Sequence, residues 1–176
     1  MTPDDEALLS RARANDTQAL AELYDAYAER IYGYLYRRVG SAQIAEDLTG
    51  DVFVKVLEAL GSGRPWHTSF NAWLYRIAHN VVVDWYRSRG TDEPASLDGS
   101  ETEANAAVSN APDVWAHREL RQALMALTEQ QQQVLILRFG EGLKVREVAE
   151  IMGKSVGAVE ALQHRALAAL REYLEG

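Results

Sequence analysis

FNAWLYRIAHNVVVDWYRSR, residues 70–89, is the part of the sequence that best indicates the fold. Its apolar side chains recur every three or four residues, the spacing that aligns side chains on one face of an α-helix. These residues are Phe70, Trp73, Leu74, Ile77, Ala78, Val81 and Trp85. Because neither Pro nor Gly interrupts the run, we expect one long helix with one buried face.

A narrower stripe follows the flank of this predicted helix. Arg76, Asn80, Val83 and Arg87 are spaced at i, i+4, i+7 and i+11, so their side chains project next to one another. Two cations and an amide beside aromatic rings suit a nucleic-acid strand, because phosphates pair with Arg and unstacked bases stack on aromatic faces. The solvated edge of an ordinary core helix has the same pattern, and because amphipathic helices are common, this segment alone favours that interpretation.

The composition of the 176 residues excludes several classes of protein. Because there is no Cys, disulfides, thiolate catalysis and the usual structural zinc sites are excluded together. The four His side chains are scattered, and we expect neither a metal nor another cofactor. The acidic N-terminus is unlike a signal peptide and no window approaches about 18 apolar residues, so we expect a soluble cytoplasmic protein without membrane insertion.

The net charge of −8 is unevenly distributed. Residues 1–89 hold 12 acidic and 10 basic side chains, and residues 118–176 hold eight of each. The 28 residues at 90–117 hold six acids and neither Lys nor Arg, and most of them are small or polar. We therefore expect two near-neutral domains, 1–89 and 118–176, joined by a flexible acidic linker. Fully extended, such a linker spans about 90 Å.

Capping residues and glycines divide the first domain into four predicted helices. Their approximate ranges are 2–14, 16–40, 42–60 and 70–89. In the second and third helices we expect Tyr24 and Leu57 among the buried residues, and in the loop before the fourth we expect an exposed Trp66. The third helix also has an acidic edge, Asp47, Asp51, Val54 and Glu58. Such an edge suits a basic helix on a partner, although a solvated face looks the same.

Residues 118–176 contain the pattern of a helix-turn-helix. Helices are predicted at 115–127 and at 128–139, the second beginning with the capping-box sequence TEQQ. A short helix at 145–152, a turn at Gly153 and a longer helix capped by Ser155 then complete the motif. Many helical hairpins share this pattern, so by itself it assigns no function.

Together these motifs resemble those of the extracytoplasmic function (ECF, group 4) sigma factors of the sigma-70 family. AEDLTGDVFVKVLEAL at 45–60 is similar to the family's core-polymerase-binding helix, and the segment 70–89 is similar to its −10 melting and recognition segment. LTEQQQQVLILRFGEGLKVREVAEIMGKSVGAVEALQHRALAAL at 127–170 is similar to its −35-binding helix-turn-helix. Two residues depart from the family pattern: Gly50, where Gln is frequent, and Glu160, where Lys is frequent.

The resemblance implies an all-α transcription initiation factor with two small helical domains, and not an enzyme. Such a factor binds core RNA polymerase, through the largest-subunit coiled coil and the beta flap, and directs it to promoter DNA. The resemblance also implies that the acidic linker threads the polymerase cleft, that an anti-sigma factor is a further partner, and that the free protein is monomeric.

The resemblance assigns three sets of residues. The polymerase-binding set is Asp47, Asp51, Val54, Lys55 and Glu58. The −10 DNA set is Arg64, Trp66, Arg76, Asn80 and Arg87. The −35 DNA set is Arg146, Lys154, Ser155, Ala158, Glu160, Ala161, His164 and Arg165.

Three other functions fit the sequence less well. A helix-turn-helix regulator with a ligand-sensing bundle explains residues 118–176, but neither the acidic edge nor the acidic linker. A sigma-like decoy that binds only an anti-sigma protein would be expected to lose its DNA-facing residues, and Arg76, Asn80, Arg87 and Arg165 are present. An enzyme is disfavoured because the paired carboxylates lack a neighbouring His, Cys or glycine-rich phosphate loop.

Overall fold

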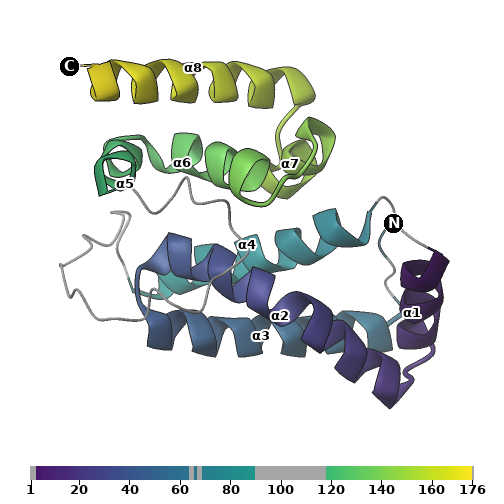
Figure 1. Cartoon of the computed structure of the whole chain (residues 1–176). Coiled ribbons are helices and arrows are strands. Elements are labelled where there is room, and N and C mark those ends of the chain that lie inside the picture. Colours follow the sequence, from purple (N-terminus) through teal and green to yellow (C-terminus); the bar gives the residue numbers. More distant parts are fainter. Residues whose placement is uncertain (1–2, 64–65, 67–68, 90–117, 176) are drawn as a thin grey trace. The chain divides into compact units, whose positions relative to one another are not determined.

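The computed structural model describes residues 3–63, 66, 69–89 and 118–175, with 3–5, 118, 119 and 121 described by their backbone alone. The regular elements in these ranges are all helices (Figure 1). The chain divides into two compact units, Met1–Asp98 and Gly99–Gly176. The predicted fold class, all-α with two small helical domains, is confirmed. The linker predicted at 90–117 lies outside the described residues.

Four helices build the first unit: α1 (Pro3–Arg13), α2 (Thr17–Val39), α3 (Ala42–Gly61) and α4 (Phe70–Ser88). Helix α2 packs along both α3 and α4, α3 packs on α4, and α1 packs on α2 and α3. In the core, the buried rings of Tyr34 and Tyr75 meet edge to face, with their centroids 5.5 Å apart. This packing positions α3 and α4 and leaves one face of each helix exposed.

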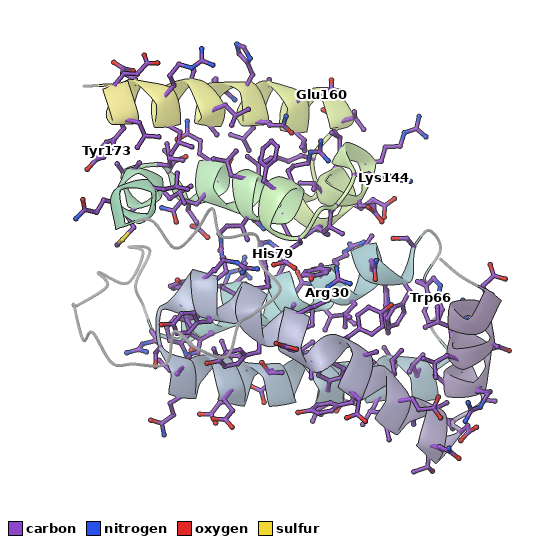
Figure 2. All side chains as sticks on the ribbon, in the orientation of Figure 1. Arg30, Trp66, His79, Lys144, Glu160 and Tyr173 are labelled. Carbon is purple, nitrogen blue, oxygen red and sulfur yellow. The ribbon has the colours of Figure 1, made fainter. Side chains whose placement is uncertain are left out.

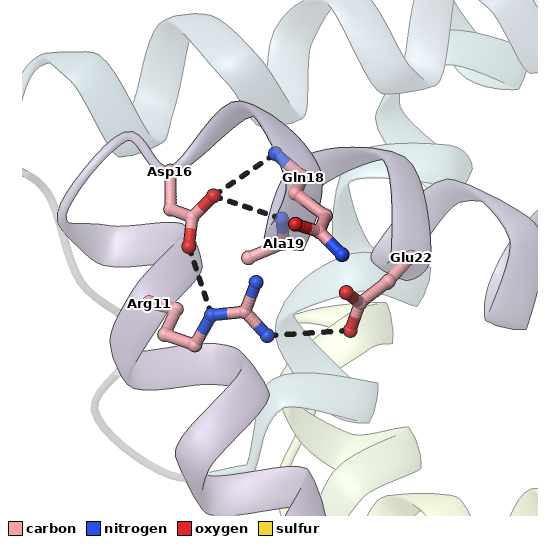
Figure 3. Close-up of polar contacts among 5 residues, drawn as sticks. All are labelled: Arg11, Asp16, Gln18, Ala19 and Glu22. Atoms are coloured by element: carbon pink, nitrogen blue, oxygen red, sulfur yellow. Dashed lines mark hydrogen bonds and ion pairs between the residues drawn. The ribbon is translucent and has the colours of Figure 1, made fainter.

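The junction of α1 and α2 is a polar cluster (Figure 3). The carboxylate of Asp16 caps α2 by accepting hydrogen bonds from the amides of Gln18 and Ala19, at 2.9 and 3.3 Å. Arg11 donates from Nε to the same carboxylate at 2.8 Å, and from Nη1 to Glu22 at 3.4 Å. The hydrogen bond from Arg11 is the main reason that the pKa of Asp16 is lowered. The cluster therefore links the end of α1 to the first turns of α2.

The other helix boundaries in this unit also follow their capping residues. Gly40 ends α2 at φ 69°, a left-handed conformation that glycine adopts without steric cost. The hydroxyls of Ser41 and Ser69 accept hydrogen bonds from the backbone of α3 and α4, and so begin these two helices. The predicted caps Asp16, Gly40 and Ser41 are confirmed.

The buried face of α4 is rotated relative to the predicted one. Phe70, Leu74, Ala78 and Val81 are buried as expected, but so are Ala72, Tyr75 and Val82, which the prediction left out. Trp73, Ile77 and Trp85 are only half-buried. The rotation arises because α4 packs against α2 as well as α3, so the buried arc extends toward Tyr75 and Val82.

Two residues of α2 and α3 were wrongly expected in the core. Tyr24 is 47% exposed and Leu57 is 48% exposed. Around α3 the buried arc ends at Phe53 and Leu60, and Leu57 lies just beyond it. Tyr24 is in a similar position on α2 and covers the ring of Phe53 from outside, at a centroid distance of 4.7 Å.

The second unit consists of α5 (Arg118–Met125), α6 (Glu129–Leu135), a π-helical segment η2 (Ile136–Gly140), α7 (Val145–Met152) and α8 (Val156–Glu175). Helix α8 packs on α5, α6 and α7. The predicted helix at 128–139 is present, but its last turn widens into the π-helical segment. No helix in the described part of the chain has the length and apolar character needed to cross a membrane.

The turns of the second unit confirm the predicted capping residues. Thr128 and Gln131 form the reciprocal capping box, with hydrogen bonds of 3.3 and 3.0 Å. Gly153 is left-handed at φ 63° and separates α7 from α8. The hydroxyl of Ser155 accepts a hydrogen bond from the amide of Ala158 at 3.2 Å and so caps α8. The helix-turn-helix geometry thus follows from these short-range signals.

Candidate functional site

The acidic edge of α3 projects away from the core. Asp47, Asp51, Val54, Lys55 and Glu58 are all exposed, and Val54 is exposed to 54%. Because they lie opposite the buried arc of α3, a partner can contact all five without disturbing the packing of the helix.

The structure adds apolar residues to this edge that the sequence analysis placed in the core. Leu57 lies next to Val54 around α3, and it follows Phe53, on which Tyr24 packs, by one turn. We call Tyr24, Val54 and Leu57 with the three carboxylates the α3 surface. Apolar side chains bordered by charges are the usual composition of a protein-binding patch. In the sequence, the i, i+3 spacing of Val54 and Leu57 was the available signal for this apolar patch. The same spacing also fits a helix with a wider buried face.

The predicted polar stripe of α4 is exposed as expected. Arg76, Asn80 and Arg87 are exposed, and Val83, between them, is half-buried. Their spacing along the helix puts one guanidinium group before and one after the amide of Asn80. The amide of Asn80 can both donate and accept hydrogen bonds, so it can pair with a base edge while the cations contact phosphates. Arg64, assigned to the same DNA set, lies outside the described residues.

Trp66 is not the open aromatic residue that the sequence suggested. It is half-buried (labelled in Figure 2). Its ring packs on Phe70 and Trp73 at centroid distances of 5.0 and 5.5 Å. The guanidinium carbon of Arg13, at the end of α1, lies 3.9 Å from the centroid of the Trp66 ring. The prediction missed this contact because the two residues are far apart in the sequence.

The predicted −35 residues lie on α7, in the turn after it and on α8 of the second unit. Lys154 is half-buried. The others are exposed: Arg146, Ser155, Ala158, Glu160, Ala161, His164 and Arg165. Small residues such as Ala158 and Ala161 allow a helix to approach a groove closely. The hydroxyl of Ser155 is already used as the cap of α8, which leaves it a structural role as well.

Arg138 was not singled out from the sequence, yet it braces the helix-turn-helix. From the π-helical segment, its Nε donates to Oε1 of Gln163 on α8 at 2.9 Å. Its Nη1 donates to the carbonyl oxygen of Leu143, in the loop before α7. Arg138 therefore connects α8, through hydrogen bonds, to the loop that precedes α7.

Comparisons with known proteins assign both units. Residues 23–91 match the family described as Sigma-70 region 2, and residues 117–170 match Sigma-70, region 4. The first match contains α3 and α4, and the second contains the helix-turn-helix.

Individual relatives agree with this assignment. The ECF RNA polymerase sigma factor BldN of Streptomyces coelicolor is 37% identical over 95% of this chain, which spans 64% of that relative. The RNA polymerase sigma factor YlaC of Bacillus subtilis is 36% identical, covering 88% of this chain and 91% of the relative. The sigma factor RpoE of Bartonella quintana, solved in complex with the anti-sigma factor NepR, shares the fold with a TM-score of 0.66. It is 19% identical and covers 88% of this chain and 96% of its own. The chain belongs to the sigma-70 family of RNA polymerase sigma factors, in its extracytoplasmic function group, which also includes the 32% identical SigX of Bacillus subtilis, covered to 82% of its length.

Proposed function

We propose that this chain binds core RNA polymerase, directs it to promoters with particular −10 and −35 elements, and helps to open the DNA. The observation that carries the proposal is the exposed stripe of α4, Arg76, Asn80 and Arg87, in the part of the chain that matches region 2. As a member of this family, the chain acts by binding and positioning macromolecules and is not an enzyme.

The α3 surface is the proposed polymerase-binding site. Its three carboxylates suit a basic partner, and the exposed Tyr24, Val54 and Leu57 supply apolar area that a solvated helix face would not need. The partner that fits this surface is the coiled coil of the largest subunit, as the family resemblance implies. Lys55 lies among the carboxylates, at i+4 from Asp51, and moderates their mutual repulsion.

The stripe of α4 is the proposed binding site for the non-template strand. Flipping a base out of the duplex costs a few kcal/mol, which stacking and hydrogen bonds in a protein site offset. Asn80 is placed to contact a base edge, and Arg76 and Arg87 to contact phosphates on either side of it. Because these residues sit on one rigid helix, capture of the strand needs little reorganisation of the protein.

Helix α8 is the proposed −35 reader. In helix-turn-helix proteins the second helix lies in the major groove, with its N-terminal residues at the base edges. The exposed residues Ala158, Glu160, Ala161 and His164 occupy this part of α8, and Arg146 and Arg165 are the proposed phosphate contacts. Lys154, half-buried in the turn, is a third candidate for a phosphate contact.

An anti-sigma factor is a further proposed partner. RpoE, which shares the fold, was solved with the anti-sigma factor NepR. In this chain Leu167, Tyr173 and Leu174 of α8 are exposed apolar side chains in addition to those of the α3 surface. An inhibitor that covers the α3 surface would compete with polymerase for it.

The decisive experiment is run-off transcription with purified core polymerase and a library of genomic fragments. The expected result is initiation from a subset of fragments that share −10 and −35 elements, with this chain as the only specificity factor. A ligand-sensing helix-turn-helix regulator, the second candidate function, would give no transcript until another sigma factor is added. That result would overturn the proposal.

A further inference from the structure

The contact between Arg13, which is exposed, and Trp66, which is half-buried, is the shortest cation–π contact in the described part of the chain. The guanidinium carbon of Arg13 is 3.9 Å from the centroid of the indole. Unstacked bases bind on the faces of aromatic side chains, so the guanidinium covers a ring face that a planar base could occupy. Arg13 is exposed, and it forms no ion pair with any side chain in the described ranges.

Helix α1 holds Arg13 in this position. Leu9 and Ala12, on the same helix, are buried in the first unit. Arg11, two residues before Arg13, forms ion pairs with Asp16 and Glu22 and so links this end of α1 to α2 (Figure 3). In the described residues the Arg13 guanidinium has the indole as its aromatic partner and no carboxylate that would hold it there.

The Trp66 ring lies beside the α4 residues that precede the stripe of Arg76, Asn80 and Arg87. Trp66 packs on Trp73, which is half-buried, and Arg76 and Asn80 follow Trp73 at i+3 and i+7 on the same helix. A strand contacting Asn80 with one base can thus bring a neighbouring base to the Trp66–Trp73 rings. The aromatic pair lies at the N-terminal end of the proposed strand-binding surface.

We propose that Arg13 is a displaceable cover for a base-stacking site on Trp66. In the free protein the guanidinium stacks on the indole, and an unstacked base of single-stranded DNA takes its place. The displaced guanidinium group then forms an ion pair with a phosphate of the DNA. This inference rests on the proposed function, because it assumes that the first unit binds the non-template strand. It adds base stacking on Trp66, a member of the predicted −10 DNA set, and it adds Arg13 of α1 as a residue that sets how readily the ring becomes accessible.

The test compares two strands that differ only in their bases. Affinities of the full chain for oligodeoxyadenosine and for an abasic phosphodiester strand of equal length are measured by fluorescence anisotropy. Removing the charge of Arg13 affects phosphate binding for both strands, so the informative quantity is the ratio of the two dissociation constants. Arg171→Ala, which removes an exposed charge from the second unit, is the matched control.

For Arg13→Ala, the preference for the strand with bases should increase about two- to five-fold, the equivalent of an exposed cation–π contact of roughly 0.5–1 kcal/mol. Arg171→Ala should leave the ratio unchanged. In NMR spectra, the ring-current shift of the Arg13 side-chain protons should disappear with oligodeoxyadenosine and persist with the abasic strand. An unchanged ratio for Arg13→Ala, or loss of the ring-current shift with both strands, would overturn the proposal.

Trp66→Leu separates this inference from the proposed function. If Trp66 stacks a base, this variant should lose preference for the strand with bases. A loss for Trp66→Leu without a gain for Arg13→Ala would refute the cover alone. No loss for Trp66→Leu would refute the stacking role of Trp66 and with it the cover, whereas transcription with core polymerase would still test the function as a whole.

Discussion

Replacing Arg138 with Met should destabilise the second unit while leaving the first intact. Met keeps much of the aliphatic volume but removes both hydrogen bonds, to the side-chain oxygen of Gln163 and to the carbonyl oxygen of Leu143. Hydrogen bonds from a charged donor contribute about 1.5–3 kcal/mol each, and half-burial of Arg138 puts these two at the lower end. The expected loss is therefore about 2–3 kcal/mol. For a unit of this size it corresponds to a drop in melting temperature on the order of 10–20 °C.

Hydrogen exchange of the full chain is the suitable assay, because it reports on the two units separately. Amides of α6 and α8 should exchange faster in the variant, and those of α2 and α3 should be unchanged. Arg138→Lys is the matched control, since it keeps the charge but cannot bond to Gln163 and Leu143 with the same planar fork. Its effect should be intermediate. If Arg138→Met changed the protection of α8 by less than about 0.5 kcal/mol, the size of an ordinary surface substitution, the bracing role would be refuted.

The remaining predictions concern the first unit. Reversing the charge at both Asp47 and Asp51 should weaken binding to core polymerase without changing the melting curve, because both side chains are exposed; unchanged affinity would mean that the edge is only solvated. Asn80→Ala should impair strand opening, measured by permanganate footprinting, more than closed-complex binding, and equal losses would make Asn80 structural. The lowered pKa of Asp16 implies stability that is present above the carboxyl's ordinary value of 3.8 and is lost as pH falls through the lower value in the folded state. Asp16→Asn, which retains a capping oxygen, should lose this acid dependence in thermal melts, and an unaltered pH profile would assign it to other groups.

Most of the fold could be predicted because its signals are local. Asp16, Gly40 and Ser41 each determine a helix end through the backbone next to them, and the capping box at Thr128 does the same in the second unit. Exposed stripes were also predictable, because spacing alone places Arg76 beside Asn80 on a helix face. The roles of these stripes in binding polymerase and DNA stay predictions.

What could not be predicted depends on which elements meet in space. Periodicity shows that α4 has an apolar face, but not that a second neighbour buries Tyr75 and leaves Trp85 half-exposed. The same limit explains Leu57, which looked like a core residue because nothing in the sequence marks where the buried arc of α3 ends. The contact of Arg13 with Trp66 joins two elements far apart in the chain, and no short-range pattern indicates it.

Glu160 provides the sharpest test of how α8 would read DNA. Glu160 is exposed near the N-terminal end of α8 (Figure 2). It is one turn from the exposed His164, and neither side chain contributes to the buried face formed by Val159, Leu162 and Ala166. A carboxylate near DNA repels phosphate, so it lowers affinity for every sequence unless it accepts a hydrogen bond, as from N4 of cytosine. We expect such a contact. Glu160→Lys should then weaken binding to the native −35 element by about 1–3 kcal/mol while other sequences gain affinity. Holoenzyme binding to a randomised −35 library measures both effects. A uniform gain across the library, with a salt dependence steeper by roughly one unit, would mean that Glu160 only repels the backbone.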